Sequence, residues 1–467
     1  MSLRFLGAAG TVTGSKYALT VGDQKLLIDC GLFQGPKELR LQNWQPLPEA
    51  ASLFQAMLLT HAHIDHSGYI PRLVRQGFRG RIFCTSPTVE LCELLLTDSA
   101  KIQQEEADYL NRHVLSAHQP ALPLYNEEDV AAALPLLKPI AYGQKLQILP
   151  GIQATFHEAG HILGSAWLEL ILQESPNSAP VRLVMSGDLG RENAPILRDS
   201  EPPVECDYLV VESTYGDRLH SDEPIGPRLA EVVRQTVSQK GVLVIPAFAV
   251  ERAQELIYIL AELYSQREIA RIPVFLDSPM ATQATHIFER HRECYDEEAK
   301  ERALLSGGLL NYRKLKLCET REQSKAIGRT PPPVVIISAS GMATGGRVLH
   351  HLRRYLPDPR NIVLLVGYQA EGTRGWRLQN GDQSLRIFGE DVEVRARVEV
   401  LDGFSGHADY RQINRWLKSL RVAPKRVFLV HGEAAALSAQ KARIDGWAGW
   451  YAHVPEALET VELSSRC

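Results

Sequence analysis

The stretch that decides the fold is THAHIDHSG, residues 60–68, which continues from the short apolar run AMLLT at residues 56–60. Alternate residues of an extended segment point to the same side, so His61 and His63 can bind one ion together. Where the chain turns towards a helix, Asp65 and His66 can reach a second ion. Imidazole nitrogens with a carboxylate are ligands suited to Zn²⁺. The alternative is a solvent-facing polar turn, but packing rarely requires so many histidines directly after a strand.

Two ions need further ligands, and three more predicted strand ends can supply them. His161 follows the run IQATFH, Asp188 follows VRLVM, and His431 follows RVFLV. Each lies beside glycine where an apolar run ends, which is where α/β sheets build their sites. One such residue alone is more typical of a turn. Together the three match the number of ligands that two zinc ions still lack, so the sequence predicts two Zn²⁺ ions.

A competing pattern occurs at residues 157–161, where HEAGH fits the H-E-x-x-H motif of zinc proteases. That motif works only on a helix, where residues i and i+4 share a face. Ile152, Ala154 and Phe156 alternate as in a strand, and Gly160 weakens any helix. We therefore reject the protease interpretation, keep His161 as a ligand and predict a supporting or packing role for His157.

The chain is predicted to form an α/β protein with more than one domain, because 467 residues exceed the usual size of one core, about 100–200 residues. Short strand-like runs dominate up to about residue 208, and a longer alternation of strands and helices follows. Short runs then return near the end. The predicted layout is a first α/β domain that is interrupted by a second and closed by C-terminal strands. Residues from Pro87 to about Arg112 are predicted to form a long helix.

Composition excludes several classes of protein. The net charge of −4 is not that of a protein that coats nucleic acid, although a local basic cleft stays open. No uncharged apolar run reaches the roughly 18 residues needed to span a bilayer, and the first residues do not resemble a secretory signal. The seven cysteines include no C-x-x-C pair, which favours a reduced cytoplasmic setting over disulfides or a cysteine-rich zinc ribbon. The oligomeric state stays open, a homodimer included.

These residues resemble the metallo-β-lactamase superfamily, whose hallmark is His-x-His-x-Asp-His with a later His, Asp and His. More narrowly, the chain is similar to the β-CASP branch of RNA- and DNA-processing nucleases. The short bacterial homologues of the pre-mRNA 3′-end cleavage endonuclease look most similar. The resemblance implies an αββα sandwich formed by residues 1–208 and 386–467, interrupted by an inserted α/β domain, the β-CASP domain, at residues 209–385.

The resemblance also assigns the metal ligands. The first zinc would be held by His61, His63 and His161, and the second by Asp65, His66 and His431, with Asp188 as the bridge. Asp29, in LLIDCG, matches an early aspartate of the superfamily that supports the ligands without binding metal.

Three marks distinguish the β-CASP branch: an acidic residue that ends DYLVVE, here Glu212, a histidine in FSGHADY, here His407, and His431 itself. Two zinc ions can share a hydroxide that acts as the nucleophile. The formal charge of that centre is about +1, which suits a phosphodiester better than a neutral amide. His407 is the candidate general acid and Glu212 its partner, although an interdomain salt bridge would use the same pair. Asp65 is counted with them as catalytic.

A glycine-rich loop between a predicted strand and a helix is the candidate phosphate site. In ASGMATGGR, backbone N–H groups could hold a phosphate at the helix N-terminus. The RNA-binding candidates are Ser340, Gly341, Thr344, Gly345, Gly346 and Arg347. Clustered Arg and Lys at residues 312–325 and 350–360 either line a nucleic-acid cleft or form solvated helix faces. His350 and His351 are expected on a helix surface.

The predicted activity is zinc-dependent hydrolysis of single-stranded RNA, with the insert restricting access to unpaired strands. Cleavage within the strand is favoured, because related 5′-exonucleases usually carry an added C-terminal domain and only 36 residues follow His431. The alternative enzyme is a thioester or lactone hydrolase of the same superfamily, which would have no use for Glu212, His407 or the insert. A scaffold subunit with a degraded site is the non-catalytic alternative, and the complete ligand set argues against it.

Overall fold

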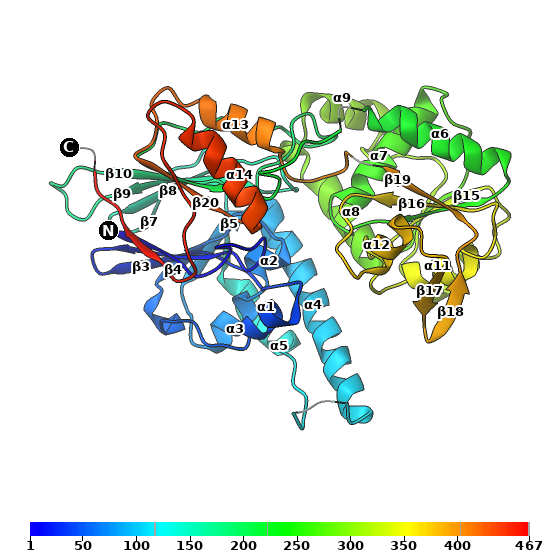
Figure 1. Ribbon diagram of the computed structural model, residues 1–467, viewed down its shortest axis with the longest axis horizontal. Helices are drawn as coiled ribbons and strands as arrows, with labels where there is room; N and C mark the ends of the chain where they lie inside the picture. Colours follow the sequence, from blue (N-terminus) through cyan, green and yellow to red (C-terminus); the bar gives the residue numbers. More distant parts are fainter. Residues whose placement is uncertain (116–117, 222, 402, 466–467) are drawn as a thin grey trace. The chain divides into compact units, whose positions relative to one another are not determined.

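The structure is a computed structural model that describes residues 1–115, 118–221, 223–401 and 403–465 (Figure 1). The chain divides into two compact units. The first unit contains Met1–Glu192, Asp199–Leu219 and His407–Cys467, and the second contains Asn193–Arg198 and His220–Gly406. Among the described residues, no helix combines the length and the apolar character that a membrane span requires.

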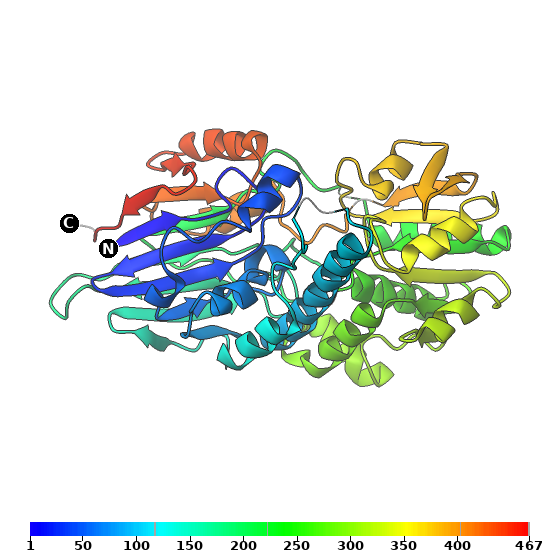
Figure 2. The same cartoon turned by 90° about the horizontal axis from the view of Figure 1, so that it is seen from below.

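Two seven-stranded sheets form the centre of the first unit. One sheet has the order β22-β1-β2-β3-β4-β5-β6 and the other the order β21-β20-β11-β10-β9-β8-β7. The first contains β1 (Ser2–Phe5), β2 (Lys16–Val21), β3 (Gln24–Cys30), β4 (Ala56–Leu58), β5 (Arg81–Thr85), β6 (Leu137–Ile140) and β22 (Thr460–Glu462). The second contains β7 (Leu146–Leu149), β8 (Ile152–Glu158), β9 (Ala166–Leu172), β10 (Val181–Met185), β11 (Tyr208–Glu212), β20 (Arg426–Val430) and β21 (Ala452–His453). β22 pairs with β1, so the first and last strands of the chain lie side by side (Figure 2).

The main core lies between these sheets. Ile28 of β3, Leu168 of β9 and Val210 of β11 belong to one buried apolar cluster that draws on both sheets. A second cluster covers the other face of the second sheet, where Ile413 and Leu437 pack from helices α13 (Tyr410–Lys418) and α14 (Ala434–Asp445). Burial of apolar area at about 25 cal/mol per Å² on both sides holds the sheets in a sandwich.

Helices α1 (Lys37–Gln42), α2 (Ile64–Ser67), α3 (Ile70–Arg75), α4 (Ser86–Arg112) and α5 (Glu127–Ala133) complete the first unit. The long helix predicted from Pro87 to Arg112 is confirmed as α4, which begins at Ser86 after the capping side chain of Thr85. Leu91 and Leu96 of α4 are buried, whereas Ile102 of the same helix is exposed. The αββα sandwich with an interrupting α/β domain is thus the fold of this chain (Figure 1).

The second unit is built on a six-stranded sheet of order β14-β13-β15-β12-β16-β19 in which every pairing is parallel. Its strands are β12 (Val242–Pro246), β13 (Val274–Leu276), β14 (Leu315–Leu317), β15 (Val334–Ser338), β16 (Ile362–Val366) and β19 (Arg397–Leu401), and β17 (Ser384–Ile387) and β18 (Glu390–Glu393) form a hairpin. Its helices are α6 (Ile225–Ser238), α7 (Arg252–Ser265), α8 (Pro279–Arg290), α9 (Glu297–Ser306), α10 (Arg321–Ile327), α11 (Val348–Tyr355) and α12 (Arg374–Gln379). Continuous apolar strands with helical crossovers are typical of a parallel sheet buried on both faces.

The compact units differ at their edges from the predicted segments 1–208, 209–385 and 386–467. Strand β11 begins at Tyr208 and continues past the predicted limit to Glu212, and it pairs with β10 and β20 of the first unit. Strand β19 lies beyond residue 385 but pairs with β16 of the second unit. Strand pairing therefore places the main crossings at Leu219 and Gly406.

The six cysteines among the described residues are buried and form no disulfide bond with one another. Cys467 lies outside the described residues.

Candidate metal centre

Four strand ends of the first unit bring the predicted ligands together. His61 and His63 follow β4, Asp65 and His66 lie on the one-turn helix α2, and His161 follows β8. Asp188 follows β10 and His431 comes directly after β20. These residues form two groups whose ligand atoms lie close enough to hold a metal ion. His161, Asp188 and His431 all face the HAHIDH turn, although His431 is 370 positions from His61 in the sequence.

The first group consists of His61, His63, His161 and Asp188. Nδ1 of His63 lies 3.1 Å from Nε2 of His61 and 3.2 Å from Nε2 of His161. Oδ2 of Asp188 lies 3.5 Å from Nε2 of each of these two histidines. Four donor atoms therefore surround one point.

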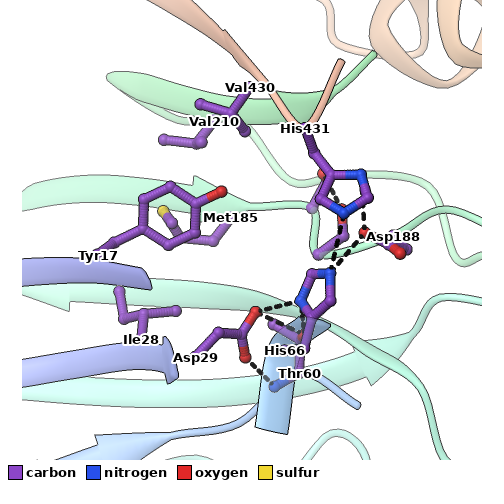
Figure 3. Close-up of a pocket in the computed structure, with 12 residues that line it drawn as sticks. Tyr17, Ile28, Asp29, Thr60, His66, Met185, Asp188, Val210, Val430 and His431 are labelled. Carbon is purple, nitrogen blue, oxygen red and sulfur yellow. Dashed lines mark hydrogen bonds and ion pairs between the residues drawn. The ribbon is translucent and has the colours of Figure 1, made fainter. Parts of the chain in front are cut away.

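The second group consists of Asp65, His66 and His431, with the other oxygen of Asp188 beside it. Nε2 of His431 lies 3.3 Å from both Nε2 of His66 and Oδ2 of Asp65. Oδ1 of Asp188 lies 3.2 Å from Nε2 of His66 (Figure 3). Asp188 therefore presents one oxygen to each group, as a bridging ligand would.

These separations fit the tetrahedral coordination of a divalent ion. Ligand atoms about 2.0–2.1 Å from a zinc ion lie about 3.3–3.4 Å from one another along the edges of a tetrahedron. Nitrogen lone pairs that face one another at this distance repel unless a cation or proton lies between them. Oδ1 of Asp188 is also buried and makes no hydrogen bond of good geometry among the described residues. The donor set thus fits the metal that the sequence predicts.

Asp29 and Thr60 hold two of the histidines from behind. The carboxylate of Asp29 accepts the backbone N–H of Thr60 at 2.8 Å and its hydroxyl at 2.9 Å. Nδ1 of His66 donates to Asp29 at 2.7 Å, and Nδ1 of His61 donates to the Thr60 hydroxyl at 3.0 Å. Each bond fixes the ring and leaves Nε2 as the free donor atom towards a metal. Asp29 lies where the resemblance places it, behind the ligands.

Thr214 and Ser15 are supporting residues that the sequence did not reveal. The Thr214 hydroxyl donates to the carbonyl of His431 at 3.2 Å and accepts Nδ1–H of the same histidine at 3.1 Å. The Ser15 hydroxyl lies 3.3 Å from Nε2 of His66, and the backbone N–H of Ser15 donates to the carbonyl of Asp65 at 2.9 Å. The only sequence signal for Thr214 is its position two residues after Glu212. Threonine and serine are too common for such a position to identify a supporting residue.

Close backbone approach explains two glycines around the centre. A Cβ atom at Gly31, after β3, would lie 1.5 Å from the carbonyl oxygen of Asp65. A Cβ atom at Gly190 would lie 1.7 Å from the carbonyl oxygen of Gly160, next to His161. Only glycine lets these loops reach the ligand segments.

Burial and neighbouring charges set the protonation states of the ligand side chains. Burial lowers the pKa of His63 to about 4 and that of His61 well below its usual value, so both imidazoles are neutral at pH 7. Burial disfavours the Asp65 carboxylate, but the hydrogen bond from His431 and the charge of His66 outweigh it and lower its pKa to about 2. The same balance holds the pKa of Asp188 well below its usual range. Burial opposes a charged His66, but Asp188 and Asp29 outweigh it and raise the pKa of His66 well above its usual value, so His66 holds a proton in the metal-free site. Neutral imidazoles and ionised carboxylates are the forms that bind metal, so metal binding would release that proton.

His407 and Glu212 form a further pair at the edge of the first group. Nδ1 of His407 lies 3.1 Å from Oε1 of Glu212 and 3.9 Å from Oδ2 of Asp188. Glu212 ends β11, is fully buried, and accepts backbone N–H groups of Leu189 and Thr214. Burial opposes the imidazolium, but the Glu212 carboxylate outweighs it and raises the pKa of His407 to about 9. Both residues belong to the first unit, so this pair is not an interdomain salt bridge.

The HEAGH segment is not a helix, as predicted. β8 extends to Glu158, and His161 follows it in a loop. The His157 ring stacks on Trp167 with centroids 3.9 Å apart, and its Nδ1 lies 3.0 Å from Glu201. His157 is therefore a packing residue outside both ligand groups.

The predicted phosphate loop lies in the second unit, after β15. The Ser340 hydroxyl accepts the backbone N–H groups of Thr344 at 3.0 Å and Gly345 at 3.4 Å. The Arg347 guanidinium donates to Asp277 at 2.8 Å and to the carbonyls of Cys318 and Glu319. These bonds shape the loop, and its phosphate-binding role stays a prediction.

The prediction that His351 lies on a helix surface is wrong. His351 is buried, and its Nε2 lies 2.6 Å from Oδ2 of Asp277, which also accepts the Ser324 hydroxyl. Its neighbour His350 is exposed, as expected. The basic residues next to His351 in the sequence suggested a surface helix, and they gave no indication of its partner Asp277, which is 74 positions away.

Three family models match the chain in consecutive segments. Residues 18–176 match the metallo-beta-lactamase superfamily domain and residues 253–378 match the Beta-Casp domain. Residues 391–455 match the Zn-dependent metallo-hydrolase RNA specificity domain.

Similar proteins cover nearly the whole chain. Ribonuclease TTHA0252 of Thermus thermophilus is 39% identical over 435 residues, which is 93% of each protein. The chain belongs to the β-CASP branch of the metallo-β-lactamase superfamily. The transcription termination factor FttA of Methanocaldococcus jannaschii is 33% identical, and the match covers 92% of this chain but 66% of that protein.

A solved structure shares the fold of this β-CASP chain. It is a crystal structure of a protein of unknown function from Enterococcus faecalis V583, with a TM-score of 0.56. The match covers 98% of this chain and 99% of that one at 12% identity. At this identity the likeness concerns the fold alone.

Proposed function

We propose that this β-CASP protein is a zinc-dependent ribonuclease that hydrolyses phosphodiester bonds within single-stranded RNA in the cytoplasm. One observation carries the proposal: Asp188 presents one oxygen to each of two groups of donor atoms, and the His407–Glu212 pair adjoins them. The family models and the names of the relatives support RNA as the substrate class. A thioester or lactone hydrolase would have no task for His407, Glu212 or the second unit, so we do not pursue that alternative.

The proposed ligands are the residues that the geometry groups. His61, His63 and His161 would hold one ion, Asp65, His66 and His431 the other, and Asp188 both. Two Zn²⁺ ions bound there would lower the pKa of a water molecule and offset negative charge on a phosphate. Asp29, Thr60 and Thr214 would orient the rings.

His407 is the proposed general acid. Because Nδ1 faces Glu212, Nε2 carries the proton that would pass to the leaving oxygen. Glu212 is a positioning residue: its two oxygens accept backbone N–H groups, and Oε1 also stabilises the imidazolium. We take O3′ as the leaving oxygen: the water adds to phosphorus, the P–O3′ bond breaks and His407 protonates O3′, which gives products with 3′-hydroxyl and 5′-phosphate ends.

A circular RNA and a linear RNA of the same sequence test the proposal. The zinc-loaded protein should cut both, because cleavage within the strand needs no free end, and the products should end in 3′-hydroxyl and 5′-phosphate groups. A fluorogenic thioester should be inert under the same conditions. Thioester hydrolysis without RNA cleavage would overturn the proposal, and cyclic phosphate ends would remove the metal-activated water from it.

A further inference from the structure

Two exposed aromatic rings lie at one edge of the parallel sheet of the second unit. Phe248 comes two residues after β12, and Tyr368 comes two residues after β16. These strands are parallel neighbours, with Val244 paired to Val363, so both rings emerge at the carboxyl edge. The Phe248 and Tyr368 side chains are 42% and 57% exposed, so both rings are open to a ligand.

The loop after β15 joins the two rings into one surface. β15 is the other neighbour of β12, with Ser338 paired to Pro246. The Phe248 ring packs against Gly341, where an added Cβ would lie 2.9 Å from Cδ2 of that ring. The side chain of Gln369, which follows Tyr368, donates to the carbonyl of Gly341 at 3.2 Å. Both aromatic segments are thus fixed against the same glycine.

The surroundings of the rings favour a nucleic-acid strand over a protein partner. The loop beside the rings is polar, with the exposed Thr344 and the partly exposed Ser340. Protein interfaces also use aromatic rings, but their fully buried core is more apolar than this hydroxyl-bearing loop. Separate flat rings beside hydroxyl groups suit unpaired nucleotides, because each base offers a π-face and each backbone unit offers polar oxygens.

We propose that Phe248 and Tyr368 are stacking residues for the unpaired bases of an RNA strand, whose backbone passes along the loop at residues 340–346. This inference rests on the proposed function and adds a base-binding surface to it. Stacking on aromatic rings tolerates any base, so the surface supplies affinity for unpaired strands without sequence preference. Paired bases are stacked on one another and cannot use it.

An abasic oligomer separates stacking from backbone binding. We would measure binding of an adenosine decamer and of an abasic ribose-phosphate decamer of equal length by fluorescence anisotropy, with EDTA present to prevent cleavage. Phe248→Ala and Tyr368→Ala should each weaken binding of the adenosine decamer by about five- to a hundred-fold and leave binding of the abasic decamer unchanged. Phe248→Tyr should retain the affinity, whereas Phe248→Leu should lose it.

Phe388→Ala is the matched control, because Phe388 is a similarly exposed ring of the second unit, on the β17–β18 turn. It should bind both decamers as the unaltered protein does. Equal weakening of both decamers by Phe248→Ala, or no weakening of the adenosine decamer, would overturn the inference. RNA cleavage by the unaltered protein tests the proposed function separately, so either idea can fail alone.

Discussion

Nδ1 of His407 lies 3.1 Å from Oε1 of Glu212, and the same oxygen accepts the backbone N–H of Leu189 at 2.7 Å. Leu189 directly follows Asp188, the residue that faces both ligand groups. The backbone of His407 is also held here, because it forms a β-bridge with Gly190. The proposed general acid is therefore fixed to the same loop as the proposed bridging ligand.

His407→Ala should lose turnover and keep its metal. His407 belongs to neither proposed ligand set, and a general acid contributes typically 10²- to 10⁴-fold, so kcat should fall by that factor while zinc content stays unchanged. RNA cleavage rates and elemental analysis of the same preparations provide the measurement. Unchanged turnover would remove His407 from the mechanism, and loss of zinc would show that it acts as a ligand.

The pH dependence should follow the protonation of His407. In the metal-free protein its pKa is about 9, so the imidazolium is present below that pH and lost above it. Bound cations repel the imidazolium, so kcat should fall as pH rises, with a midpoint at or below about 9. NMR of the metal-free protein should show His407 titrating near pH 9, and Glu212→Gln should lower that value. A pH profile for His407→Ala that retained the same alkaline fall would contradict this assignment.

Histidine substitutions in the HEAGH segment should separate ligand from packing roles. His161→Ala should lose RNA cleavage and weaken zinc binding, because its Nε2 belongs to the first group. His157→Ala is the matched control: it should lower the melting temperature modestly through the lost stacking on Trp167 while keeping zinc and activity. His63→Ala should behave as His161→Ala does. Equal metal content in the His157 and His161 variants would refute the ligand assignment.

Thr214 should affect metal affinity through His431. Thr214→Val keeps the side-chain shape but removes the hydroxyl that bonds Nδ1 of His431. Loss of such a supporting bond typically costs 10- to 100-fold in metal affinity. Zinc competition titrations should show this loss for one of two bound ions. Thr214→Ser retains the hydroxyl and should bind zinc as the unaltered protein does, and equal affinity of the Val and Ser variants would contradict the role.

The sequence was most informative where chemistry restricts the residue types. Packing does not require His61, His63, Asp65 and His66 to cluster after a strand, so the pattern by itself indicates a metal site. The same logic applies to His161, Asp188 and His431 at strand ends, which a sheet gathers at one edge. The geometry brings all seven together in two groups.

Less could be predicted where a contact depends on which elements pack together. Thr214 meets His431 across 217 positions, and threonine is too common to be noticed alone. His351 was expected at the surface because its helix is basic, but its pairing with Asp277 depends on how the segment after β13 packs against α11. The compact units differ from the predicted segments at β11 and β19, because β11 pairs with β20 of the first unit and β19 pairs with β16 of the second.

Anomalous X-ray scattering at the zinc edge, on crystals of the zinc-loaded protein, tests the central claim most directly. The account predicts two peaks of comparable height, one contacted by His61, His63 and His161 and the other by Asp65, His66 and His431, with Asp188 bound to both. Elemental analysis should give two ions per chain. A single ion, or peaks away from Asp188, would contradict the paired centre on which the proposed chemistry depends.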